Sequence, residues 1–312
     1  MSSFAIISDT SCDLRANLRE RFGIADYVRG YTYLPDGTDI KASLDWSEEE
    51  SDAFFKELSK KTGGYKTSTP SSFEAAEVIE KQLKEGNDVL CVTLSSGLSG
   101  MYGVVTNAAK ELREKYPERK LIVVDSMRYS TAEGMVCLMA SQYRDAGYSI
   151  EETAELLEKN KGRVHQIGWM DDLFYCKKVG RVSNAAAVMG TLIGIKAMAD
   201  FNHKGMSHVL GKTRGYKSAY RYVVEYMKKT GENLENQIVF VCHTLRKEHA
   251  LEVKKLIEEE IKPKEVIIST VGQGSAPNVG PGLVAAFYIG KEISEDAKEE
   301  IEIFNELASQ IK

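Results

Sequence analysis

The sequence predicts an α/β protein of two domains, because short apolar strands alternate with amphipathic helices along the chain. Up to residue 161 the alternation is regular, which is typical of a three-layer domain with a parallel sheet between two layers of helices. A chain of 312 residues is long enough for two such cores. After Gly162 a basic loop, a small-residue segment and a hairpin pattern follow one another. We therefore expect domains at residues 1–161 and 162–312.

In the first half, apolar β-branched runs predict strands, and apolar positions at helical spacing predict helices. The expected strands are Phe4–Ile7, Tyr31–Leu34, Val89–Leu94 and Leu121–Val124. The expected helices begin at Asp13, Ser47, Phe73, Ser99 and Thr131, and a last one follows Ser149. Ser71 or Ser72 is the expected cap of the third helix, and Ser149-x-x-Glu152 forms a capping box before the last.

The second half has a less regular order of elements. The expected strands are His165–Met170, Ile195–Phe201, Met206–Leu210, Ile238–Cys242, Val266–Val271 and Val284–Ile289. The expected helices cover residues 185–193, 217–229, 246–260 and 294–311. The turn sequence Asn202-His-Lys-Gly205 between two strands indicates a hairpin.

The composition is typical of a soluble globular protein and excludes several classes of function. Apolar residues make up 43% of the chain and charged residues 28%, and the formal net charge is −5. A negative net charge disfavours general nucleic-acid binding, and no apolar run reaches the roughly 18–20 residues of a membrane span. The N-terminus lacks the basic segment of a signal peptide, and the five cysteines show no metal-like spacing. We expect a cytoplasmic protein with free thiols and no metal site.

A strand, a small polar loop and a helix start follow one another at residues 89–102, and the loop reads Ser95-Ser-Gly97-Leu-Ser-Gly. Glycine lets the backbone approach a ligand closely, and the first amides of a helix point toward such a loop with the positive end of the helix dipole. Serine hydroxyls add further donors. These residues alone leave two interpretations open: a carboxylate or phosphate site, or an ordinary cap and turn.

A second hydroxyl-rich segment, Thr67-Ser-Thr-Pro-Ser71, stands just before another helix. Pro70 makes Thr69 extended, so this segment also leads from an extended stretch into a helix N-terminus. We expect both hydroxyl loops to face the same edge of the parallel sheet. Asp9 ends the first strand, where open α/β sheets place ligand contacts, although an aspartate there also caps loop amides.

Patterns of other kinds of site are missing from the sequence. No lysine follows the glycines as in a phosphate-binding loop, and the Gly-x-Ser-x-Gly elbow of hydrolases does not occur. The five histidines lack metal-ligand spacing and are expected at surface or packing positions. Asp171 and Asp172 are expected in a turn. Lys177, Lys178 and Arg181 form a basic loop that is either a solvated face or a docking patch for an acidic partner.

Seven short motifs occur in one order over nearly the whole chain, from about Phe4 to Tyr288. They are Asp9-Thr-Ser-Cys-Asp13-Leu14, Thr67-Ser-Thr-Pro-Ser71, Ser95-Ser-Gly-Leu-Ser-Gly100, Val124-Asp125-Ser126, Lys178-Val-Gly-Arg181-Val-Ser183, Ile195-Lys196 and Val279-Gly-Pro-Gly282. Each is weak singly, but their shared order is specific. In this order the chain resembles the DegV family of lipid-binding proteins, also known as the fatty-acid-binding subunits of bacterial fatty acid kinase.

The resemblance implies a DegV-like fold, with a three-layer N-terminal domain, a two-layer C-terminal domain on a mixed sheet, and a long-chain fatty acid between the two. By position, Thr67 and Ser96 would hold the fatty acid carboxylate, with Ser68, Ser95 and Gly97 as neighbours. The acyl tail would enter the second domain. The chain would present its ligand to a fatty acid kinase, for which Lys177, Lys178 and Arg181 are the candidate docking residues. It would itself be no enzyme and would need no cofactor.

Two residues depart from the pattern of many family members. Thr69 stands where many have Gln, and Asn278 stands where many have His. Asn278 is a candidate ligand-binding residue because its amide can hydrogen-bond a carboxylate, but it cannot carry charge. An imidazole-dependent kinase step therefore does not carry over directly. The alternatives are a small-molecule kinase or transferase domain that uses the serine loop for phosphate, and a binder of another acidic lipid.

Overall fold

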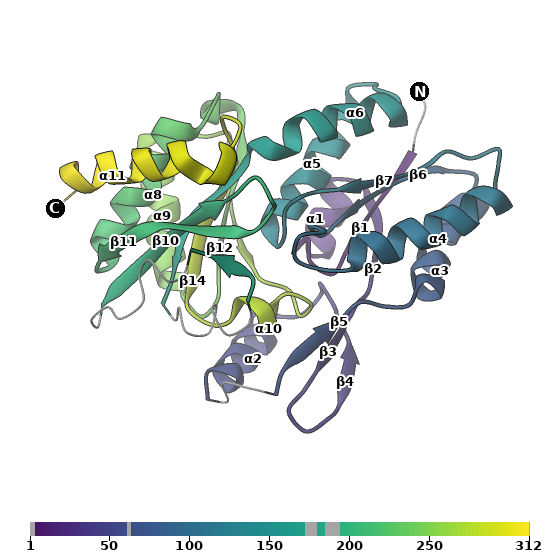
Figure 1. The fold of residues 1–312 in the computed structure, drawn as a ribbon, viewed down its shortest axis with the longest axis horizontal. Coiled ribbons are helices and arrows are strands. Elements are labelled where there is room, and N and C mark those ends of the chain that lie inside the picture. Colours follow the sequence, from purple (N-terminus) through teal and green to yellow (C-terminus); the bar gives the residue numbers. More distant parts are fainter. Residues whose placement is uncertain (1–3, 61–63, 172–179, 185–193, 312) are drawn as a thin grey trace. The chain divides into compact units, whose positions relative to one another are not determined.

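The computed structural model describes residues 4–60, 64–171, 180–184 and 194–311 (Figure 1). The chain forms two compact units. Unit 1 contains Met1–Trp46, Gly63–Lys161 and Gly272–Pro277, and unit 2 contains Ser47–Thr62, Gly162–Val271 and Asn278–Lys312. Two segments thus depart from a single division after residue 161: 47–62 lies in unit 2, and 272–277, which we call the return segment, lies in unit 1.

Unit 1 is built on a four-stranded parallel sheet in the order β2-β1-β6-β7. Its strands are β1 (Phe4–Asp9), β2 (Ile24–Val28), β6 (Asp88–Thr93) and β7 (Leu121–Asp125). Its helices are α1 (Ala16–Arg21), α3 (Ser72–Lys84), α4 (Met101–Lys115), α5 (Thr131–Asp145) and α6 (Ile150–Asn160).

Side chains alternate along these strands, so that one face of the sheet packs on α3 and α4. This face carries Ala5, Ile7, Val89 and Cys91, all buried. Helices α5 and α6 pack on the sheet from its other side (Figure 1). The predicted three-layer architecture of the first half is confirmed.

A small antiparallel sheet completes unit 1, with strands in the order β4-β3-β5. Its strands are β3 (Tyr31–Tyr33), β4 (Asp39–Lys41) and β5 (Lys66–Ser68). The sequence predicted only β3, whose aromatic and β-branched residues alternate into Leu34, whereas β4 and β5 lack such a run.

Unit 2 is built on a seven-stranded mixed sheet in the order β13-β12-β14-β8-β10-β11-β9. Its strands are β8 (Val164–Met170), β9 (Val182–Ser183), β10 (Ile195–Phe201), β11 (Ser207–Arg214), β12 (Ile238–His243), β13 (Glu265–Thr270) and β14 (Leu283–Ile289). Its α-helices are α2 (Glu48–Lys60), α8 (Tyr216–Thr230), α9 (Lys247–Glu260) and α11 (Lys298–Gln310). Short helices stand at η1 (Lys161–Arg163), η3 (Leu234–Asn236), η4 (Glu295–Ala297) and α10 (Ala276–Val279), two of which cross a unit boundary.

Helices α8, α9 and α11 share one hydrophobic core with this sheet. Trp169, Tyr226 and Phe304 are among its buried side chains. The α/β fold class, with a parallel sheet in one part of the chain and a mixed sheet in the other, is therefore confirmed. The helix predicted at residues 185–193 lies outside the described residues.

Local expectations succeeded where short-range hydrogen bonds decide the structure. Ser71 and Ser149 each form a capping box, with Glu74 and Glu152. The β10–β11 hairpin forms as expected, and Asn202 Oδ1 accepts backbone amides of its turn.

The four described cysteines are free and buried, and Cys176 lies outside the described residues. Among the residues that the structure describes, no helix is both long and apolar enough to cross a bilayer.

The helix expected from Asp13 starts three residues later, at Ala16. Asp13 adopts a left-handed backbone conformation with φ 56°, which a helix cannot include, and its side chain is buried. The helix expected from Ser99 likewise begins at Met101. In both cases side-chain and backbone contacts, which the sequence pattern does not show, set the boundary.

A buried polar pair lies inside the sheet of unit 2. His165 Nδ1 is 2.6 Å from Asp200 Oδ2, both side chains have no solvent exposure, and the other ring nitrogen of His165 is 2.8 Å from the carbonyl of Lys291. The amide of Gln166 donates to Asp200 Oδ1 at 2.8 Å, and the hydroxyl of Tyr226 donates to Oδ2 at 3.0 Å. His165 is thus a packing residue, as the sequence predicted.

Replacing Asp200 with Asn should lower the free energy of unfolding by about 3–5 kcal/mol, because the exchange leaves buried donors without an acceptor. Urea or guanidinium titration of the purified protein measures this. Asp145→Asn is the matched control, because its carboxylate is 67% exposed beside Arg144 and should change stability by less than about 0.5 kcal/mol. Equal losses in the two variants would contradict this role of Asp200.

Candidate functional site

The serine loop, residues 95–100, connects β6 to α4 and uses its own backbone amides internally. Ser95 is buried, and its carbonyl accepts the amides of Leu98 at 3.0 Å and Ser99 at 3.2 Å. The hydroxyl of Ser95 accepts the amide of Gly97 at 3.2 Å. Ser95 therefore shapes the loop: its carbonyl and hydroxyl accept amides of the loop, and its own amide donates to the carbonyl of Arg128 at 2.8 Å.

The start of the serine loop is fixed by two aspartates that end neighbouring strands. Asp9, at the end of β1, accepts the amide of Leu94 on Oδ2 at 2.8 Å. Asp125, at the end of β7, accepts the amide of Ser96 at 3.2 and 3.3 Å on its two oxygens. Two roles for Asp9 were open from the sequence, and in unit 1 its carboxylate accepts loop amides.

These contacts change the predicted anion site in one respect. The amides of residues 95–99 all donate within the protein, so they do not form the open cradle that we expected of this loop. Ser96 and Gly97 are exposed, and the hydroxyl of Ser96 remains the most accessible hydroxyl of the loop for a ligand. The hydroxyl oxygen of Ser99 accepts the amide of Met101, the first residue of α4, at 3.3 Å.

The second hydroxyl segment begins as a strand of the small antiparallel sheet, where Lys66–Ser68 pairs with β3. That both hydroxyl segments face the same edge of the parallel sheet stays a prediction. Thr67 stands opposite Thr32, and Ser68 stands opposite Tyr31. Successive residues of a strand point to opposite faces. Thr67 therefore shares the inner face with Thr32, which is fully buried, whereas Ser68 is on the outer face, 3.3 Å from the hydroxyl of Tyr33.

The structure nevertheless brings the two hydroxyl segments close together inside unit 1. A Cβ atom added at Gly30 would lie 2.8 Å from the carbonyl oxygen of Ser68 and 3.9 Å from Cε of Met101, the first residue of α4. A Cβ atom added at Gly100 would lie 3.9 Å from Cγ2 of Thr69. Thr69 of the second hydroxyl segment and Gly100 of the serine loop are thus neighbours, and a glycine at position 30 permits the close approach of the Ser68 backbone.

The return segment lies against the inner face of the small sheet. The hydroxyl of Thr32 donates to the carbonyl of Gln273 at 3.0 Å, and Oε1 of Gln273 accepts the amide of Ser43 at 2.9 Å. Thr32 is the strand partner of Thr67. The backbone that leads into Asn278 is therefore anchored on the same sheet as Thr67, while Asn278 itself belongs to unit 2.

The buried carboxyl group of Asp13 holds the return segment, a role that the sequence did not predict. Asp13 Oδ1 accepts the amide of Gly272 at 2.7 Å, and Oδ2 accepts the hydroxyl of Ser130. Burial raises the pKa of Asp13 to about 7 and that of Asp9 to about 6. Burial, followed by the charges of Asp9 and Asp13, raises the pKa of Glu133 well above its usual value. The sequence pattern placed Asp13 at the start of a helix. Only its position in the motif Asp9-Thr-Ser-Cys-Asp13-Leu14 singled it out.

Of the predicted docking residues, Arg181 is exposed, and Lys177 and Lys178 lie outside the described residues. Asp171 follows β8 in a bend, and Asp172 lies outside the described residues. No group of three or more His, Cys, Asp and Glu side chains suited to a metal ion occurs within the described parts of the chain.

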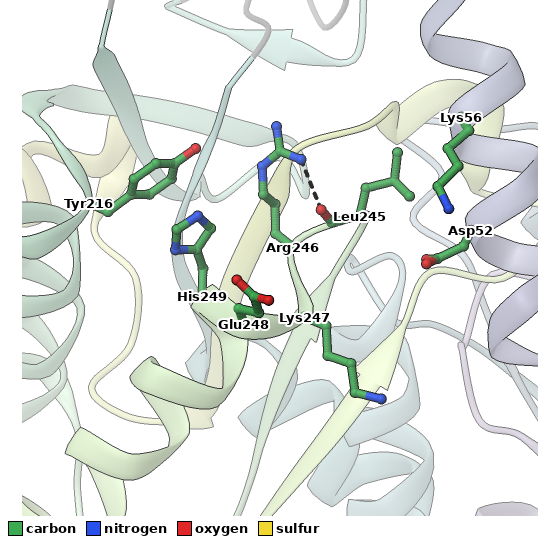
Figure 2. Close-up of a pocket in the computed structure, with 8 residues that line it drawn as sticks. All are labelled: Asp52, Lys56, Tyr216, Leu245, Arg246, Lys247, Glu248 and His249. Atoms are coloured by element: carbon green, nitrogen blue, oxygen red, sulfur yellow. Dashed lines mark hydrogen bonds between the residues drawn. The ribbon is translucent and has the colours of Figure 1, made fainter.

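A surface cavity of about 500 Å³ opens in unit 2, and none of the predicted site residues line it (Figure 2). It is lined by Asp52, Lys56, Tyr216, Leu245, Arg246, Lys247, Glu248 and His249. Arg246 Nε donates to Asp171 at 2.7 Å, and the rings of Tyr216 and His249 stack with centroids 3.7 Å apart. Burial and the charge of Arg246 lower the pKa of His249. Acidic and basic side chains nearly balance here, so the cavity shows no preference for an ion of either sign.

The chain matches a family model over residues 3–291, and the model is described as "uncharacterised protein, DegV family". A DegV domain-containing protein of Clostridium perfringens is 30% identical over 93% of this chain and 98% of its own length. A second one, from Caldanaerobacter subterraneus, is 29% identical over 92% of this chain and 99% of its own length. The chain belongs to the DegV family.

Solved structures share the fold of nearly the whole chain. A DegV lipid-binding protein from Thermotoga maritima is 25% identical, with a TM-score of 0.80 over 93% of this chain and 99% of that chain. A DegV family protein from Thermus thermophilus, described by its fatty acid binding, is 24% identical, with a TM-score of 0.81 over 92% and 99%. At 24% identity, the likeness to the second structure shows only that the fold is shared.

Stability should fall as pH rises from about 4 to about 7. Asp13 keeps its proton in the folded protein up to a pKa of about 7, whereas the usual value is 3.8, so unfolding releases a proton in this range. The raised pKa values of Asp9 and Glu133 also make stability fall as pH rises. The charge of Arg15 opposes the rise in the pKa of Asp13. Urea midpoints between pH 4.5 and 7.5 measure the slope.

Asp13→Asn should flatten this slope, because the amide keeps an acceptor for Gly272 and has no proton to lose in this range. Asp88→Asn is the control, because Asp88 caps the amide of Lys120 at the other end of β6 and is half-buried. An unchanged slope in Asp13→Asn, or stability that rises over this range in the unmodified protein, would contradict the assignment.

Proposed function

We propose that this chain binds one long-chain fatty acid, with the carboxyl headgroup at the hydroxyls of Thr67 and Ser96 in unit 1. The observation that carries the proposal is the adjacency of two hydroxyl segments in a DegV-family fold, with Thr67 on the inner face of its sheet and Ser96 exposed in the loop. Structures of DegV proteins from other bacteria are described as lipid-binding or fatty-acid-binding. Asn278 is a third candidate contact.

In this proposal the acyl tail supplies the affinity and the headgroup contacts supply the orientation. Burial of each methylene contributes about 0.8 kcal/mol, so a long tail offers on the order of 10 kcal/mol before the cost of association. Each hydrogen bond to a charged carboxylate adds about 1.5–3 kcal/mol. Uncharged donors orient the headgroup without the strong attraction of a lysine or arginine, which keeps the ligand exchangeable.

We further propose that the chain is a cytoplasmic, non-enzymatic subunit that presents its fatty acid to a kinase for phosphorylation and onward acyl transfer. The buried free thiols and the family resemblance support this role. Exposed Arg181, with Lys177 and Lys178, is the proposed docking patch for an acidic surface of that partner.

Protein purified from a bacterial host should carry a long-chain fatty acid that was never added, because a buried apolar tail dissociates slowly. Native mass spectrometry should show the chain with one extra mass of a fatty acid, and denaturation should release it. Solvent extracts should contain the same acid. Lipid-free protein that stays lipid-free after incubation with palmitic acid, or that binds magnesium-ATP saturably in calorimetry, would contradict the proposal.

Thr67→Ala and Ser96→Ala should each weaken palmitic acid binding by about ten- to a hundredfold in delipidated protein, because each removes one hydrogen bond to the headgroup. Fluorescence titration measures the affinities. Ser68→Ala is the matched control, since Ser68 lies next to Thr67 in the chain but on the opposite face of β5. Its affinity should change by less than about threefold. Equal effects of Thr67→Ala and Ser68→Ala would place the headgroup elsewhere.

A further inference from the structure

Asp125 contacts the backbone amide of Ser96, the residue whose hydroxyl is a proposed headgroup contact. It is the last residue of β7, and the two oxygens of its carboxylate lie 3.2 and 3.3 Å from the amide nitrogen of Ser96. Oδ1 also accepts the amide of Met127 at 2.9 Å. The Asp125 carboxylate therefore occupies the amide that an anionic headgroup at Ser96 would otherwise use.

The negative charge of Asp125 has no cation in contact with it within the described parts of the chain. Lys161 Nζ donates to the backbone carbonyl of Asp125 at 2.8 Å, and it forms an ion pair with Glu158 at 2.6 Å. The carboxylate of Asp125 itself receives only backbone amides, which are dipoles and not full charges. Its field at the serine loop is thus reduced but not cancelled.

The distance from this carboxylate to a bound headgroup is short compared with the range over which charges interact in salt solution. The hydroxyl of Ser96 is within about 4 Å of its own amide nitrogen, and a ligand oxygen bonded to that hydroxyl would be about 2.8 Å further on. When the 3.2 Å contact between Asp125 and the Ser96 amide is added, the charge of Asp125 and the charge of the headgroup lie within about 10 Å of each other. This is no more than one Debye length at an ionic strength of 0.1 M, so screening leaves part of the repulsion.

We infer that Asp125 determines which headgroup charge the serine loop accepts: it repels anionic headgroups and favours neutral ones, including a protonated carboxyl group. The inference rests on the proposed binding of a fatty acid headgroup at Ser96. A headgroup with two negative charges, such as that of an acyl phosphate, is repelled more strongly than a carboxylate with one. The tail holds the ligand while Asp125 limits how strongly the head is held.

Asp125→Asn separates charge from geometry. The asparagine Oδ1 still accepts the amides of Ser96 and Met127, so the loop keeps its hydrogen bonds while the charge is removed. The matched control is Asp88→Asn, which removes one half-buried charge at the opposite end of β6, where the carboxylate accepts the amide of Lys120 at 3.0 Å. Circular dichroism and urea unfolding check that all three proteins are folded.

The probes are palmitic acid and methyl palmitate, which share a tail and differ in headgroup charge. In delipidated protein at pH 8 and 20 mM salt, Asp125→Asn should bind palmitic acid about three- to thirtyfold more tightly than the unmodified protein. Binding of methyl palmitate should change by less than about twofold, as should binding of both probes to Asp88→Asn. A positioning role alone would instead weaken both probes in Asp125→Asn.

The unmodified protein provides a second readout that needs no variant. The ratio of its affinities for palmitic acid and methyl palmitate should rise between about 20 and 500 mM sodium chloride, because salt screens the repulsion from Asp125. A ratio that is flat or falls with salt, or an Asp125→Asn variant with unchanged or weaker preference for the acid, overturns the inference. If the unmodified protein binds neither probe, the proposed function fails and the inference fails with it.

Discussion

The candidate site depends on the hydrogen bonds that the buried carboxylate of Asp9 accepts from two loops. Its two oxygens accept the amide of Ser11 and that of Leu94, each at 2.8 Å, and so tie the loop after β1 to the start of the serine loop. Burial of this group is costly, which is why its pKa is raised to about 6. Asp13, four residues later, holds the return segment through Gly272. Two aspartates of one short motif thus fix both the serine loop and the backbone that leads to Asn278.

Sequence patterns predicted the parts of this arrangement that local physics decides. The alternation of strands and helices, the capping boxes at Ser71 and Ser149, and the β10–β11 hairpin depend on periodicity and on contacts a few residues apart. The strand β5 and the opposite faces of Thr67 and Ser68 depend on pairing with β3 and have no local signal. The role of Asp13 was equally hidden, because its acceptor groups serve residues more than a hundred positions away.

The site has a physical character that differs from an ordinary anion site. Anion sites gather free amides and cations, whereas the amides of residues 95–99 donate to Ser95, Asp125 and the carbonyl of Arg128. Ser96 is exposed beside the carboxylate of Asp125, and Thr67 is half-buried in the small sheet. In the proposed function, such a site would hold the headgroup weakly, and the apolar tail would supply most of the affinity.

The most direct test of the account is carbon-13 NMR of palmitic acid labelled at its carboxyl carbon and bound to delipidated protein. The account predicts one bound resonance in the unmodified protein that shifts in both Thr67→Ala and Ser96→Ala and stays in place in Ser68→Ala. A bound resonance whose chemical shift is unchanged in both Thr67→Ala and Ser96→Ala would show that the headgroup lies away from the hydroxyl segments and would contradict the account.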